Sequence, residues 1–167
     1  MIIDVHVHPP SHRDEVSQDE KRTDTVIRSG FGSPLSTTNS VNDFVKAMAV
    51  VDKAVVFASA PAPSNPDFAI LPLDGWPNGM NHNDITAEVA SRAPDKFIPF
   101  MSVHPLDPAS NEEYDRAIGD LGCKGMKLAP PYQFFDPVGE EAFKLYARLS
   151  QDRLPIVFHQ GTSPVWD

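Results

Sequence analysis

Five short apolar runs alternate with segments of helical periodicity along this chain, and this alternation constrains the fold more than any other feature. The runs are Met1–His8, Lys53–Ala60, Lys96–His104, Gly125–Leu128 and Leu154–His159. Short apolar runs bounded by turn residues predict buried strands. Strands that alternate with helices predict parallel pairing with right-handed crossovers, so we expect an α/β fold.

The segments between the later runs carry apolar residues at helical spacing. This spacing predicts helices over Val41–Val51 with Ser40 as N-cap, over Asp84–Arg92, from about Asn111, and over Val138–Asp152. Two long stretches, about residues 9–39 and 61–79, are polar or rich in Pro and Gly and have no sustained period. We interpret both as long loops, which in compact domains are usually functional or partly disordered.

Composition indicates one globular domain and narrows the classes of partner. The chain has 167 residues, 41% of them hydrophobic, and a net charge of -9. Because nucleic acids and anionic membranes are bound mainly through clustered Lys and Arg, we expect neither as a partner. The sequence contains no cationic leader and no run near the roughly 18 apolar residues of a membrane span. We therefore expect a cytoplasmic protein, and the single cysteine, Cys123, excludes an internal disulfide.

Two histidines end the first apolar run. A two-residue alternation would place Asp4, His6 and His8 on one face of a strand that Pro9 and Pro10 terminate. Neutral imidazoles side by side at the carboxyl end of a strand can hold one divalent metal. A motif this short also arises by chance, so its context decides between a metal site and ordinary surface histidines.

His159 ends the fifth run and is the second candidate ligand. The carboxyl ends of parallel strands lie at similar height, so His159 can join the first pair across a closed barrel. The alternative is a histidine that is merely hydrogen-bonded at a strand end. Three imidazoles and a water would complete a catalytic zinc site.

Three sequence motifs carry a family resemblance. They are Ile3–Pro9, Gly125–Pro130 and Leu154–Gly161, with further similarity at Val51–Val56 and Pro94–Phe97. Together they resemble the amidohydrolase-related metal-dependent enzymes of the amidohydrolase superfamily. That group includes enzymes like aminocarboxymuconate-semialdehyde decarboxylase. The resemblance implies a (β/α)8 TIM barrel with one divalent metal, most simply zinc with manganese as an option, held by His6, His8 and His159.

The resemblance also implies residues that this sequence does not contain. Such enzymes use a histidine on the sixth strand and an aspartate on the eighth, whereas this sequence stops at Asp167, just after the fifth strand. A complete barrel needs roughly 250 residues. We therefore expect residues 1–167 to form a single incomplete TIM-barrel domain of about five βα units, inactive alone, with the catalytic acid and base beyond Asp167. Strands one and five should be its open edges, covered by a second copy of the chain or a complementary C-terminal half.

The expected function is metal-dependent hydrolysis of a small, carboxylated organic substrate. One alternative is a non-oxidative decarboxylase, a carbon–carbon lyase of the same fold. A second alternative is a non-catalytic half-barrel or one chain of a split enzyme. A metal-dependent nuclease is less favoured because the acidic chain offers no basic surface for phosphates.

Lys127 is the remaining candidate site residue. It projects opposite to Met126 and Leu128, hence toward the barrel interior. We expect it to bind an anionic substrate or to pair with a buried carboxylate, in preference to bridging two metals as a carboxylated lysine.

Several other residues are weaker candidates. We expect His104 to be an ordinary hydrogen-bonded histidine, and His12 and His82 to be solvated in loops. Aromatic residues near strand ends either wall an apolar pocket or pack in the core: Trp76, Tyr132, Phe134, Phe135 and Trp166.

Overall fold

Parallel strands form the centre of the molecule, as the alternation predicted. A computed structural model describes residues 1–29, 38–66 and 75–161. The strands are β1 (Ile3–Val7), β2 (Lys53–Phe57), β3 (Phe97–Phe100), β4 (Met126–Leu128) and β5 (Ile156–Phe158). β1, β2 and β3 pair in that order, and β4 pairs with β5. A parallel bridge between Met101 and Met126 joins the two groups, so the described strands lie side by side in chain order.

The four helices expected from apolar spacing are confirmed with small shifts at their ends. They are α2 (Val41–Ala47, continued by the 3₁₀ turn η1, Met48–Val50), α3 (His82–Ser91), α4 (Ser110–Gly119) and α6 (Glu140–Gln151). Ser40 caps α2 as expected: its hydroxyl accepts from the backbone N–H of Asp43, and the Asp43 carboxylate accepts from that of Ser40.

Two helices were not predicted. α1 (Gln18–Ser29) lies in the stretch interpreted as a loop over residues 9–39, so that interpretation is wrong for this segment. The apolar spacing missed α1 because nearly all of its residues are polar or charged. The short helix α5 (Pro130–Gln133) begins with two prolines, which are tolerated in a first turn. Of the other predicted loop, residues 67–74 lie outside the described residues, and its described parts contain no helix or strand.

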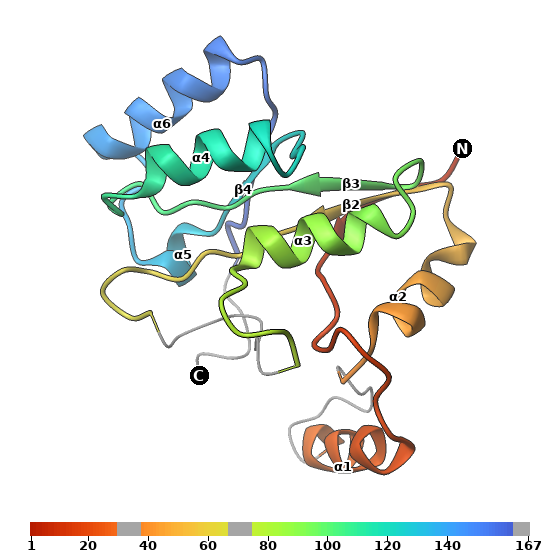
Figure 1. Cartoon of the computed structure of the whole chain (residues 1–167). Coiled ribbons are helices and arrows are strands. Elements are labelled where there is room, and N and C mark those ends of the chain that lie inside the picture. Colours follow the sequence, from red (N-terminus) through yellow and green to blue (C-terminus); the bar gives the residue numbers. More distant parts are fainter. Residues whose placement is uncertain (30–37, 67–74, 162–167) are drawn as a thin grey trace.

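The core lies on the face of the strands that the helices cover (Figure 1). On β2 and β3, Ala54, Val56 and Phe97 pack against α2 and α3. Toward β4, a second cluster joins the strands to α4 and α6: Met101, Met126, Leu128, Tyr114, Leu145 and Leu149. Burying each large apolar side chain contributes about 1.5–3 kcal/mol, so these two clusters fix the sheet against its helices.

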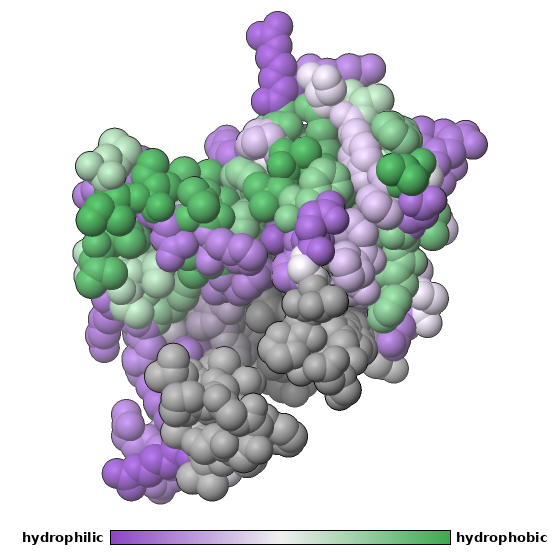
Figure 2. All heavy atoms as spheres, turned by 180° about the vertical axis from the view of Figure 1, so that it is seen from behind, coloured by the Kyte–Doolittle hydropathy of each residue, from purple (hydrophilic) through white to green (hydrophobic). Residues whose placement is uncertain are grey.

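The opposite face, here called the inner face, carries the alternating side chains Val55, Phe57, Ile98, Phe100, Lys127 and Val157. Its aliphatic members, Val55, Ile98 and Val157, are only half-buried. Gly125 lies against this layer, where an added Cβ would come within 2.5 Å of the Phe100 ring. Figure 2, seen from the side opposite to Figure 1, shows apolar residues gathered in a band across the molecule. Part of the apolar surface of this chain is therefore left uncovered.

β1 and β5 are the outermost of the described strands, which confirms the expected edges. The side chain of Val5 on β1 is 65% exposed, and Ile3 is also exposed. β5 is only half-buried along its length. An exposed apolar edge strand offers unpaired backbone groups to a further strand.

No helix in the described part of the chain is long and apolar enough to cross a membrane. Cys123 is a free thiol inside the α4–α6 cluster. Burial raises the pKa of this thiol to about 12, so it is protonated and unreactive at neutral pH.

Candidate active site

His6 and His8 lie together at the carboxyl end of β1. Their ring centroids are 5.3 Å apart. Both rings contact Phe57 of the neighbouring strand, with centroid distances of 5.2 Å for His6 and 6.1 Å for His8. Phe57 is completely buried and forms the floor beneath the pair. The sequence analysis missed this residue, although the alternation along β2 places it on the inner face.

Asp4 does not share the face of the two histidines, so that part of the prediction is wrong. The register shifts between Asp4, which pairs with Ala54, and Val7, which pairs with Val56. β1 therefore contains one residue more than β2 over this segment, and such a bulge reverses the alternation. The Asp4 carboxylate instead accepts a hydrogen bond from the backbone N–H of His6 at 3.0 Å.

Both imidazoles are neutral at pH 7. Burial lowers the pKa of His8 to about 4, and the charges of His6 and Lys127 act in the same direction. Burial also lowers the pKa of His6, again with a contribution from Lys127. The Nδ1 atom of His8 is buried without a hydrogen-bond partner. A neutral imidazole with an unpartnered nitrogen is the form that binds a metal, so this pair fits a divalent cation.

Lys127 lies over the same floor as the histidines. Its Nζ is 4.9 Å from the centroid of the Phe57 ring, and the residue is only 4% exposed. Burial lowers the pKa of its ammonium group. Among the described residues no carboxylate forms a salt bridge with Lys127, so the expected pairing with a buried carboxylate is not seen there. A buried ammonium without a counter-ion suits an anionic ligand.

His159 follows β5, and its backbone N–H donates to the carbonyl oxygen of Leu128 at 2.8 Å. Its ring packs on Tyr132, with centroids 4.7 Å apart, and Nε2 is 2.9 Å from the carbonyl oxygen of Gly161. His159 lies near enough for its charge to help lower the pKa of His6 and His8, behind burial as the main cause. Within residues 1–29, 38–66 and 75–161, no three His, Cys, Asp or Glu side chains form a group able to hold a metal. Convergence of all three imidazoles stays a prediction.

The other histidines are held by the fold. His104 is an ordinary hydrogen-bonded histidine, as expected. Its Nδ1 accepts from the backbone N–H of Leu106 at 3.1 Å, which leaves Nε2 to donate to the carbonyl oxygen of Gln133 at 2.6 Å. The expected solvation of His12 and His82 is wrong. His12 is half-buried beside Gly75, and His82 is buried in the first turn of α3.

The aromatic residues near strand ends mostly pack in the core. Trp76 is buried and donates its indole N–H to the carbonyl oxygen of Pro10. Phe135 packs in the α4–α6 cluster, whereas Phe134 is 54% exposed. Within the described residues, Tyr132 contacts a candidate ligand, His159. Trp166 lies outside the described residues.

Solved structures of similar fold include a TIM-barrel protein and proteins named as a decarboxylase and a hydrolase. An uncharacterized TIM-barrel protein from Bordetella bronchiseptica is 19% identical with a TM-score of 0.61, over 99% of this chain and 57% of that one. A 5-carboxyvanillate decarboxylase from Novosphingobium aromaticivorans, crystallised with manganese, is 20% identical with a TM-score of 0.62, over 98% and 52%. A probable 2-pyrone-4,6-dicarboxylic acid hydrolase from Acinetobacter baumannii is 14% identical with a TM-score of 0.53, over 95% and 49%.

The chain thus spans about half the length of these structures. Together with the parallel strands in chain order, this identifies the fold as part of a (β/α)8 barrel, roughly its first five βα units. No curated protein matches the sequence. The sequence model of the amidohydrolase family matches residues 3–166, and the chain therefore belongs to the amidohydrolase family.

Proposed function

We propose that this chain is the N-terminal part of a metal-dependent hydrolase that acts on a small, carboxylated organic substrate. One divalent metal, zinc or manganese, would be held by His6, His8 and His159. The observation that carries the proposal is that two neutral imidazoles share the Phe57 floor with a buried ammonium, which has no salt bridge within the described ranges.

The charges of this site favour an anionic substrate. The ammonium of Lys127 and a bound metal would both be cationic, and their mutual repulsion falls when an anion lies between them. Burial strengthens this effect, because Lys127 and Phe57 are both removed from water. The names of two structurally similar proteins, the 5-carboxyvanillate decarboxylase and the 2-pyrone-4,6-dicarboxylic acid hydrolase, specify carboxylated compounds, which supports the same class.

Five residues of this chain have roles in the proposed reaction. When bound, a divalent metal supplies an activated water and polarises a carbonyl group. His6, His8 and His159 hold that metal, and Lys127 orients the substrate carboxylate. Phe57, which lies beneath the two histidines of β1, excludes water from that side of the site. The acid and base that move protons are expected on the sixth and eighth strands, outside this sequence.

Decarboxylation is the second candidate function, favoured by the similarity to the 5-carboxyvanillate decarboxylase. Lys127 would orient the carboxylate in either reaction. The two reactions differ in product, so the assay measures carbon dioxide release and water addition on 5-carboxyvanillate and 2-pyrone-4,6-dicarboxylate. Carbon dioxide without net addition of water would replace the hydrolase proposal with the lyase.

Metal binding provides the direct test. We expect Zn²⁺ or Mn²⁺ to bind at one site by isothermal titration calorimetry. His8→Ala should weaken binding by about 100-fold, because the roughly 10–16 kcal/mol of a zinc site is shared among its ligands. His12→Ala is the matched control, since Nδ1 of His12 is already hydrogen-bonded with the Ser11 hydroxyl at 2.8 Å. Equal metal affinity in the His8→Ala and unaltered proteins would rule out the proposed centre.

We propose that a partner covers the two open edges of the sheet, β1 and β5, and supplies the remaining barrel strands. β1 exposes Val5 and Ile3, and the inner face is only half-buried. Further strands of the same polypeptide, a complementary half or a second copy would cover both. Ultracentrifugation and solution scattering of the 167-residue chain provide the test. A compact monomer that unfolds cooperatively, binds no metal and is inactive would favour the non-catalytic half-barrel instead.

A further inference from the structure

A second pocket, separate from the histidine pair, opens between the carboxyl ends of β2 and β3 and the first turns of α3 and α4. Its volume is about 210 Å³. One wall is apolar and is made by Ala60, Pro61, Ala62, Pro63 and Val103. His6, His8, Lys127 and His159 are not among the residues that line it. A cavity of this size and lining suits a single small ring better than an extended ligand.

His82 borders this pocket. The residue is the first of α3 and is only 5% exposed. In the described part of the chain its ring makes no hydrogen bond or ion pair. Burial lowers the pKa of His82 to about 4, so the ring is neutral and offers one N–H donor and one acceptor nitrogen. The ring nitrogens of His82 are not among the fully enclosed unpaired atoms of the described residues, so a ligand hydroxyl can reach one of them from the pocket.

The helix ends around the pocket add a preference for a ligand oxygen. The N-cap of α4, Ala109, makes no side-chain capping bond, so the first-turn N–H groups of this ten-residue helix lack a side-chain acceptor. The N-terminus of α3, in contrast, is capped by Asn81. An oxygen at the α4 end of the pocket would face the positive end of the helix dipole.

The carboxylates at the rim disfavour an anion. Glu113 lines the pocket but accepts hydrogen bonds from Arg116, Asn81 and Asn83, so its acceptor sites are used. Asp107 also lines the pocket and accepts from the backbone N–H of Ala109, with no salt bridge among the described residues. A ligand carboxylate would be repelled by Asp107 and would find no Lys or Arg among the described residues that line the pocket.

We propose that this pocket binds a small uncharged ring that carries a hydroxyl group, with His82 as its hydrogen-bonding partner. Phenol is the simplest member of this class. The ring lies against the prolines and alanines, and the hydroxyl makes one hydrogen bond to His82, donating to its acceptor nitrogen. This site differs from the one that contains Lys127, where an anion is favoured, and it does not depend on the proposed function.

Three probes on the unaltered 167-residue chain test the proposal. Phenol should give saturable shifts of the His82 and Ser110 amide signals by nuclear magnetic resonance. Benzene, which keeps the ring but lacks the hydroxyl, should bind about tenfold more weakly, as expected for the loss of one hydrogen bond to a buried group. Benzoate should bind more weakly than phenol because of Asp107. Benzene binding as well as phenol, or benzoate binding better, would overturn the proposal.

Two variants locate the effect at His82. His82→Phe should remove the difference between phenol and benzene, since the ring remains but the partner for the hydroxyl is lost. His82→Gln, which keeps a donor and an acceptor, should preserve part of that difference. Ser91→Ala, at the exposed end of the same helix, is the control and should change neither affinity. Persistence of the phenol preference in His82→Phe would show that the hydroxyl is bound elsewhere.

Discussion

The two faces of the sheet differ in whether their buried polar groups have hydrogen-bond or ion-pair partners. On the helix-covered face, Met126, Leu128 and Tyr114 are fully buried among apolar neighbours. On the inner face, Lys127 is buried with no salt bridge among the described residues, and Nδ1 of His8 is buried with no hydrogen-bond partner there. Unsatisfied polar groups lower stability, so their presence beside Phe57 indicates that the inner face is arranged for binding, whereas the apolar clusters of the other face serve stability.

Neighbouring residues of β4 provide the most sensitive test of this difference. Leu128→Ala should lower the free energy of unfolding by about 2–5 kcal/mol, because it leaves a cavity in the α4–α6 cluster. Lys127→Met, one residue away, should leave the free energy unchanged or raise it by about 1 kcal/mol, since it removes an unpaired buried charge. Urea denaturation monitored by circular dichroism measures both.

The same pair of variants separates stability from binding. Lys127→Met should weaken binding of a carboxylated substrate to the metal-loaded enzyme while the fold persists. Comparable destabilisation by both substitutions would show that the inner face is part of the structural core, and the contrast between the faces would then fail.

Much of this architecture could be predicted, because strands and amphipathic helices leave a periodic record in the sequence. Ser40 as the α2 cap and the strand ending in His6 and His8 are local features of this kind. The bulge that turns Asp4 away could not be predicted, since it depends on the register with β2. The burial of His82 was missed because its neighbours in the sequence are polar, and the residues that cover it come from distant loops.

Acid provides a test of the second pocket against the rest of the molecule. The pKa of His82 is lowered by burial from 6.5 to about 4. Between these values the unfolded chain binds more protons than the folded one, so stability is full above pH 6.5 and is lost as pH falls toward 4. The difference between the two pKa values corresponds to about 3.5 kcal/mol at about 1.4 kcal/mol per pH unit, of which roughly 3 kcal/mol is lost by pH 4.

The measurement is the urea midpoint of unfolding at several pH values between 7 and 4. In His82→Gln the drop over this range should be smaller by roughly 3 kcal/mol, since that contribution is removed while other titrating groups, His8 included, remain. The same pH profile in both proteins would place the His82 ring in water, contrary to its burial.

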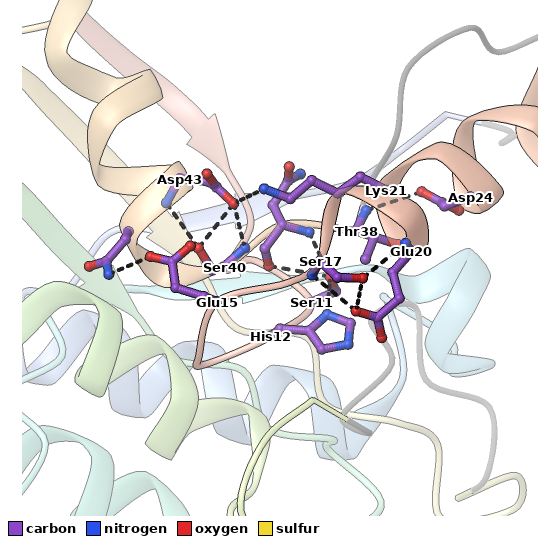
Figure 3. Close-up of polar contacts among 12 residues, drawn as sticks. Ser11, His12, Glu15, Ser17, Glu20, Lys21, Asp24, Thr38, Ser40 and Asp43 are labelled. Atoms are coloured by element: carbon purple, nitrogen blue, oxygen red, sulfur yellow. Dashed lines mark hydrogen bonds and ion pairs between the residues drawn. The ribbon is translucent and has the colours of Figure 1, made fainter.

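The smallest effect on stability is expected from the ion pair between α1 and α2. Lys21 of α1 donates to the Asp43 carboxylate, which also serves the cap of α2 (Figure 3). The hydrogen bond from Lys21 is the main cause that lowers the pKa of Asp43 to about 2, but both side chains remain partly in contact with water. Solvent screening limits such a pair to about 0.2–1 kcal/mol.

Lys21→Met should therefore hardly change global stability, yet speed hydrogen exchange in α1, because that helix has few apolar residues to hold it. The effect should shrink in high salt, and Arg22→Met, which disturbs only an exposed pair with Asp19, should not reproduce it. If exchange in α1 is equally slow in the Lys21→Met protein, then packing and not charge holds this helix, as it does for the helices that cover the sheet.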